Sequence, residues 1–117
     1  MYSPELLDHF QHPRNAGTLE NADAVVRVEN PVCGDVLELY VKVEEKRIVE
    51  IRFKAKGCVP SMACGSAITE LAKGKSIETA REFRIDDVLR KVGGVPETSK
   101  HAGVLAVDAL RAALKSL

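Results

Sequence analysis

Two cysteines, an aspartate and a histidine stand where regular elements of this 117-residue chain are expected to begin or end. Cys33 and Asp35 belong to a Cys-Gly-Asp turn before a strand, Cys58 follows a strand-like run, and His101 opens the last amphipathic segment. Thiolates, carboxylates and imidazoles are the side chains that bind zinc or an iron–sulfur cluster. We therefore expect metal or sulfur chemistry at one tip of a small domain.

Each of these residues also has an ordinary structural interpretation. A free cysteine such as Cys33 is often a small buried hydrophobic residue, and Asp35 suits a turn in which it bonds its own backbone. Cys58 has the stronger functional context, because backbone N–H groups at a helix start favour a thiolate. A lone histidine such as His101 is usually structural. Since the sequence has no Cys-x-x-Cys pair, spacing alone leaves the metal hypothesis open.

The remaining cysteine and histidines fit a structural role better. Cys64 shares a helical stripe with Ile68 and Leu71, which predicts a buried core thiol. The alternative for Cys64 is a substitute metal ligand. His9 and His12 have no thiol near them in sequence, and we expect both on the surface.

Length and composition exclude several classes of protein. A chain of 117 residues predicts a single domain over residues 1–117. Its 17 basic residues balance 17 acidic ones, so we expect no nucleic-acid partner. No apolar run approaches the roughly 18 residues of a membrane span, and the first residues lack a signal-peptide profile. Three cysteines, an odd number, argue against a disulfide framework and favour the cytoplasm.

Hydrophobic periodicity predicts an α+β fold. Period-two alternation marks strands over residues 26–28, 37–43 and 49–55, with a hairpin at 44–47. Helical signals follow from Pro60 to Gly74, around residues 77–80 and 88–92, and from His101 to an apolar stripe that includes Leu117. A first helix begins after Ser3. Strands followed by helices predict a three-stranded antiparallel sheet with helices packed on one face.

At the candidate residues the chain resembles the IscU/NifU-type family of iron–sulfur cluster scaffolds. Several separate motifs carry the resemblance in the family's order and run nearly from end to end. They are Tyr2-Ser3, Asp8-His9, His12-Pro13-Arg14-Asn15, Cys33-Gly34-Asp35-Val36, Arg52-Phe53-Lys54, Gly57-Cys58, Thr69-Glu70, Lys73-Gly74-Lys75-Ser76, His101, Leu105-Ala106 and Asp108-Ala109.

The resemblance implies a scaffold or carrier that is not an enzyme and that holds a labile cluster, in the [2Fe–2S] form, or zinc. By position, Cys33, Asp35, Cys58 and His101 match the family's metal ligands. The implied partners are a cysteine desulfurase, which supplies sulfur, and apo-proteins that accept the cluster. The implied fold agrees with the one that periodicity predicts.

Two departures from the family pattern leave alternatives open. Ala102 stands where the family has a third cysteine, and residues 95–99 read Val-Pro-Glu-Thr-Ser in place of a Leu-Pro-Pro-Val-Lys chaperone motif. A dedicated Hsp70-type partner is therefore not expected. The alternatives are a zinc-binding sulfur acceptor that assists a cysteine desulfurase and a degenerate homologue that works through protein contacts alone. A Cys-His-Asp hydrolase triad is disfavoured, because no oxyanion-hole motif accompanies it.

Overall fold

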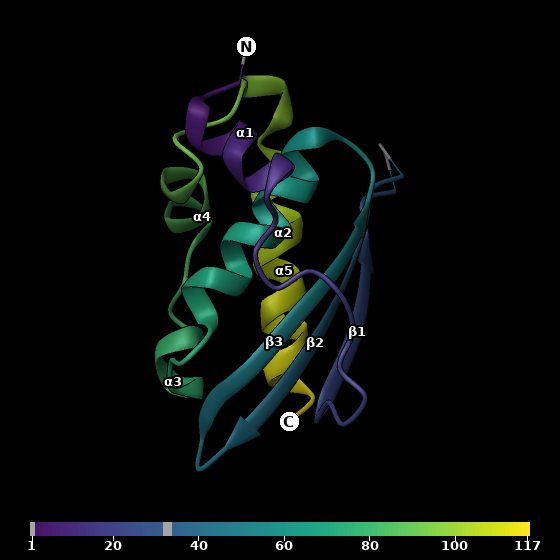
Figure 1. Ribbon diagram of the computed structural model, residues 1–117, viewed down its shortest axis with the longest axis vertical. Coiled ribbons are helices and arrows are strands. Elements are labelled where there is room, and N and C mark those ends of the chain that lie inside the picture. The colour runs from purple at the N-terminus through teal and green to yellow at the C-terminus, as the bar shows by residue number, and fades with distance from the viewer. Residues whose placement is uncertain (1, 32–33) are drawn as a thin grey trace.

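The computed structural model describes residues 2–31 and 34–117 of the chain. Over these residues an antiparallel sheet in the order β1–β2–β3 packs on one face against helices (Figure 1). The elements in chain order are α1 (Pro4–Gln11), β1 (Ala24–Glu29), β2 (Val36–Glu44), β3 (Arg47–Lys56), α2 (Val59–Ala72), α3 (Ile77–Ala80), α4 (Ile85–Lys91), a 3₁₀ turn η1 (Glu97–Ser99) and α5 (His101–Lys115). The predicted α+β class with a three-stranded antiparallel sheet is confirmed.

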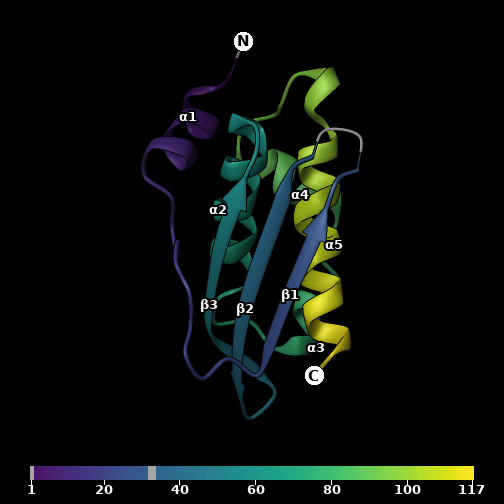
Figure 2. The same cartoon turned by 90° about the vertical axis from the view of Figure 1, so that its right-hand side faces the viewer.

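The hydrophobic core lies between the sheet and the helix pair α2 and α5, which Figure 2 shows behind the strands. Leu37, Leu39 and Val41 alternate along β2 and are fully or almost fully buried. Helix α2 contacts α1, α4, α5 and β3, and almost every residue from Ala63 to Ala72 is buried. A helix that is covered on nearly all sides has no single apolar stripe. No helix in the described part of the chain is long and apolar enough to cross a membrane.

The start of β3 departs from the predicted alternation. The alternation over residues 49–55 predicts that Val49 faces the core together with Ile51, but Ile48 is fully buried and Val49 is only half-buried. The pairing register shifts between Lys42 and Val43, so that Val43 pairs with Ile48 while Lys42 pairs with Glu50. A β-bulge adds one residue to a strand and therefore reverses which residues face the core beyond it.

The helix ends agree with the capping signals except at the C-terminus. Ser3 accepts a hydrogen bond from the Leu6 backbone N–H and is followed by proline at the first helical position, as predicted. The assignment of Leu117 to the apolar stripe of the last helix is wrong. Helix α5 ends at Lys115, and the Leu117 side chain beyond it is 42% exposed.

Four element ends meet at one end of the molecule, which is the upper end in Figure 1. There β2 begins, β3 ends, and α2 and α5 both begin. The outer edge of β3 is covered by the segment that follows α1, because the Phe53 backbone N–H donates to Asn15 O and the Gly17 N–H donates to Phe53 O. A covered edge leaves fewer free backbone groups for pairing with another chain.

The register shift predicts unequal effects of two neighbouring substitutions on β3. Ile48→Ala should lower the free energy of unfolding by about 2–5 kcal/mol, because it empties a buried site. Val49→Ala should lower it by about 1 kcal/mol or less, because that side chain is half-exposed. Urea denaturation of both variants checks this. A larger loss for Val49→Ala would contradict the register.

Candidate metal centre

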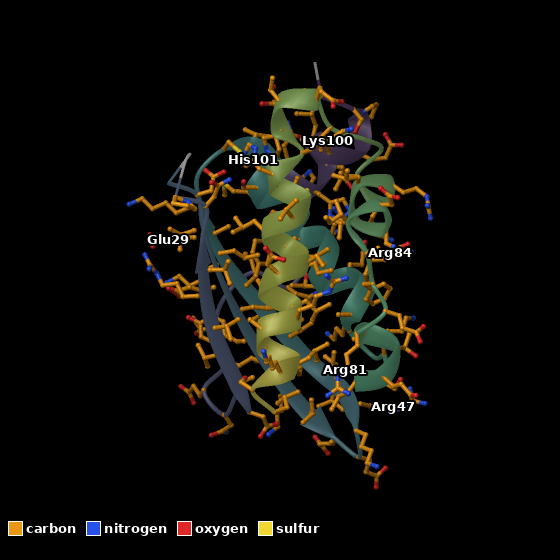
Figure 3. All side chains as sticks on the ribbon, turned by 180° about the vertical axis from the view of Figure 1, so that it is seen from behind. Glu29, Arg47, Arg81, Arg84, Lys100 and His101 are labelled. Atoms are coloured by element: carbon orange, nitrogen blue, oxygen red, sulfur yellow. The ribbon has the colours of Figure 1, made fainter. Side chains whose placement is uncertain are left out.

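Three potential metal ligands from three parts of the chain converge at this end. Asp35 directly precedes β2, Cys58 is the N-cap residue of α2, and His101 is the first residue of α5. One ligand atom from each lies within 4.8 Å of the other two. Figure 3 shows His101 at the first turn of α5, beside the end of the sheet. Atoms that share one tetrahedral zinc ion lie roughly 3.5 Å apart, so small side-chain movements suffice to bring the three onto one ion.

The fourth predicted ligand, Cys33, lies outside the described residues. Its proximity to Cys58 therefore stays a prediction. The assignment of Cys33, Asp35, Cys58 and His101 as the ligands of one ion is likewise a hypothesis, which is taken up below as a proposal.

Asp35 stands at the centre of the cluster and is only 3% exposed. Its Oδ2 accepts a hydrogen bond from the Ser61 hydroxyl at 2.7 Å and from the Cys58 thiol at 3.4 Å. The same oxygen lies 3.2 Å from His101 Nε2. Its Oδ1 accepts from the Cys58 backbone N–H at 3.2 Å. Among the described residues, the side-chain partners of this turn aspartate thus belong to other elements, at the starts of α2 and α5.

These contacts keep the buried carboxyl of Asp35 ionised. Burial disfavours the charged form, but hydrogen bonds from the Ser61 hydroxyl, from the backbone and thiol of Cys58, and from His101 outweigh it, and the pKa of Asp35 lies below its ordinary value. A carboxylate that accepts several hydrogen bonds is stabilised as the anion. At neutral pH the site therefore presents the negative charge of Asp35 beside the side chains of Cys58 and His101.

Cys58 has two further neighbours besides Asp35. Its Sγ lies 3.2 Å from the Ser61 hydroxyl oxygen and 3.9 Å from His101 Nε2. The residue is half-buried and stands at a helix N-terminus, where backbone N–H groups and the helix dipole favour negative charge. Sulfur, nitrogen and oxygen donors of this kind suit zinc or iron.

Gly57 is the residue that permits this arrangement between β3 and α2. Its φ of +143° is one that residues with a side chain rarely adopt, and a Cβ atom at this position would lie 2.0 Å from Asp35 Oδ1. A glycine is therefore needed both for the backbone conformation and for the close approach of the carboxylate.

Cys64 lies in the core and is fully buried, as predicted. Burial, with a smaller contribution from the electrostatic interaction with Cys58, raises the pKa of the Cys64 thiol to about 12. A thiol in this environment stays protonated and is a poor metal ligand.

Sequence reasoning missed Ser61, and it placed His9 wrongly. Ser61 is 2% exposed and contacts both Asp35 and Cys58, and its spacing of three residues from Cys58 was the available signal.

His9 was expected on the surface but is 4% exposed, and its Nδ1 lies 2.8 Å from the Ser66 hydroxyl. It follows the buried Leu6 by three residues and so shares the face of α1 that packs on α2. Burial is the main cause that lowers the pKa of His9.

Comparisons with known proteins found a matching family and several similar proteins. The model of the NifU-like N-terminal domain family matches residues 1–117. Iron–sulfur cluster assembly scaffold protein IscU 1 of Archaeoglobus fulgidus is 48% identical over 97% of this chain and 74% of its own length. The IscU scaffold protein of Escherichia coli K12 is 38% identical over 97% of this chain and 91% of its own length. The crystal structure of an N-terminal NifU-like protein from Brucella abortus shares the fold, with a TM-score of 0.77 and 20% identity over 97% of this chain and 92% of that one.

Substitution of Gly57 should disturb the site more than substitution of a glycine with similar backbone strain. Gly57→Ala and Gly17→Ala both place a side chain at a positive φ, +143° and +127° respectively, and each should cost about 1–3 kcal/mol of stability. Only Gly57→Ala also displaces the Asp35 carboxylate, because a Cβ added at Gly17 would have no atom within 4 Å. Zinc titration of both folded variants should show weakened binding for Gly57→Ala alone. Equal zinc affinities would contradict the proposed role of Gly57.

Cys64→Ser should affect stability rather than metal binding. The new hydroxyl would lie among apolar neighbours, which should lower the free energy of unfolding by about 1–3 kcal/mol. The amount of zinc bound per chain should stay that of the parent, whereas Cys58→Ser should lose most of it. Urea denaturation and metal analysis of the two serine variants check this. An equal loss of metal in the Cys64→Ser and Cys58→Ser variants would show that Cys64 is a ligand.

Proposed function

The chain belongs to the NifU-like N-terminal domain family, and we propose that it is a scaffold on which an iron–sulfur cluster is assembled and from which the cluster is passed on. The family match over residues 1–117 and the IscU scaffold relatives at 38–48% identity support this role. A scaffold of this kind is not an enzyme, because the cluster is its cargo and not a cofactor for turnover. The resemblance that the sequence motifs predicted is confirmed.

The observation that carries the proposal is the convergence of Asp35, Cys58 and His101 at one end of the sheet. We assign Cys33, Asp35, Cys58 and His101 as the residues that hold the iron of the cluster. Thiolates bind iron strongly, whereas a carboxylate oxygen binds it more weakly. A mixed set of donors therefore suits a protein that must release its cargo.

The site is also partly exposed to solvent. The His101 side chain is 25% exposed although the Asp35 side chain is only 4% exposed. A partner can therefore reach the imidazole and the half-buried thiol while the carboxylate stays in place. This geometry suits transfer to another protein better than permanent storage.

The proposal implies two kinds of partner. A cysteine desulfurase would supply the sulfur, and apo-proteins would accept the assembled cluster, in the [2Fe–2S] form. A dedicated Hsp70-type chaperone is not part of the proposal, because residues 95–99 lack the family's chaperone motif. The cytoplasm is the proposed compartment, because three cysteines cannot all be paired in disulfides within one chain.

Zinc is the second candidate cargo, and one position favours it. Ala102, which is 1% exposed in the first turn of α5, replaces the thiolate that the family pattern has beside the histidine. Fewer sulfur donors reduce the preference for a cluster, and the remaining sulfur, nitrogen and oxygen donors suit zinc. The corresponding function is a zinc-binding sulfur acceptor that assists the desulfurase.

Anaerobic reconstitution with iron and sulfide distinguishes the two functions. The parent chain should become brown, absorb in the visible range and transfer its cluster to an apo-ferredoxin. His101→Ala should lose most of the bound cluster, whereas His12→Ala should retain it, because the exposed His12 lies outside the site. Metal and sulfide analysis checks the yields. If the parent chain stays colourless but binds zinc, the scaffold proposal is contradicted and the zinc-binding sulfur acceptor is supported instead.

A further inference from the structure

We propose that Ser61 is a positioning residue of the metal centre, whose hydroxyl donates a hydrogen bond that orients the Asp35 carboxylate or the Cys58 thiolate while the metal is bound. This inference rests on the proposed function. Ser61 is the third residue of α2 and is 2% exposed. Its hydroxyl donates to Asp35 Oδ2 at 2.7 Å and its oxygen lies 3.2 Å from Cys58 Sγ.

The Asp35 carboxylate accepts hydrogen bonds from several donors before any metal is bound. Among the described residues, they are the Ser61 hydroxyl, the Cys58 backbone N–H, the Cys58 thiol and the His101 imidazole. Together they offset the burial of a side chain that is only 4% exposed. A buried charge that loses its hydrogen-bond donors is strongly destabilised.

Metal binding removes two of these donors. A cysteine binds a metal ion as the thiolate, and a histidine binds through a ring nitrogen that carries no proton. The Cys58 thiol and His101 Nε2 can therefore no longer donate to Asp35 once they are ligands. The Cys58 backbone N–H and the Ser61 hydroxyl are the donors that remain. Within the described residues, Ser61 is thus the one side chain that still donates to the carboxylate without being a ligand itself.

The second contact of Ser61 extends its role to the sulfur. A hydroxyl has one proton to donate and two lone pairs that accept. Its oxygen lies within reach of both negatively charged ligands, so its proton can serve either Asp35 Oδ2 or the Cys58 thiolate. Hydrogen bonds of this kind orient metal ligands, and their loss typically lowers metal affinity by about 10–100-fold.

Ser66 provides a matched control on the same helix. It is also fully buried, but its hydroxyl contacts His9 Nδ1 and accepts from the Arg14 backbone N–H. Ser66→Ala therefore removes a buried hydroxyl from α2 without removing a contact of the metal centre. The comparison of the two alanine variants separates a role at the site from a general effect on helix packing.

The test is the dissociation constant for Zn²⁺, measured by competition with a chromophoric chelator. Ser61→Ala should bind Zn²⁺ about 10–100-fold more weakly than the parent, and Ser66→Ala should bind it as the parent does. The thiolate-to-cobalt absorption of the Co²⁺-loaded proteins should change for Ser61→Ala alone. Ser61→Thr and Ser61→Val have nearly the same shape, and the threonine variant, which keeps a hydroxyl, should bind Zn²⁺ more tightly. This second pair keeps the test valid if Ser61→Ala does not fold.

Three results would overturn the inference. Parent-like Zn²⁺ affinity of Ser61→Ala, together with a lower melting temperature of the metal-free protein, would show that the hydroxyl is merely structural. Equal Zn²⁺ affinities of the threonine and valine variants would also show that the Ser61 hydroxyl has no role in metal binding. Failure of the parent chain to bind Zn²⁺ would overturn both this inference and the proposed metal site, whereas the first two results leave the proposed function intact.

Discussion

The carboxylate of Asp35 is almost fully buried, yet it stays charged, and this constraint organises the upper end of the molecule. Its charge is stabilised by hydrogen bonds from the start of α2 and by the imidazole at the start of α5. Gly57 has no side chain, which leaves room for the carboxylate between the sheet and α2. The fold thus brings two helix starts to one anion, and helix starts favour negative charge. The thiol and imidazole that converge there are a consequence of the same arrangement.

The α+β class and the strand pairing could be predicted from the sequence, because alternation of apolar residues and capping signals are local properties. The residue that faces the core at the start of β3 could not be predicted in this way, since Ile48 faces the core only because of a bulge in the pairing with β2. The burial of His9 depends in the same way on a partner that is distant in sequence, Ser66 of α2. Periodicity reports one element at a time and contains no information about such contacts.

The candidate site shows the same division. The types and positions of Asp35, Cys58 and His101 were recognisable, because each stands at a predicted element boundary and matches a family motif. Ser61 was not recognisable from the sequence, because a serine in the first turn of a helix is common. Its contacts with the site appear only when β2 and α2 are placed together. In the site as described, Cys58 is accompanied by one oxygen and one nitrogen donor, and Ala102 stands where the family pattern has a third cysteine. A set with few sulfur donors binds iron less strongly than a set of four thiolates.

The central claim is that Asp35, Cys58 and His101 bind one and the same metal ion. A crystal structure of the zinc-loaded protein, with anomalous scattering measured at the zinc edge, tests it most directly. We predict one zinc ion bonded to Cys58 Sγ, to His101 Nε2 and to an Asp35 oxygen at about 2.0–2.3 Å. A zinc ion bound elsewhere on the surface, with Cys58 and His101 unligated, would contradict the claim.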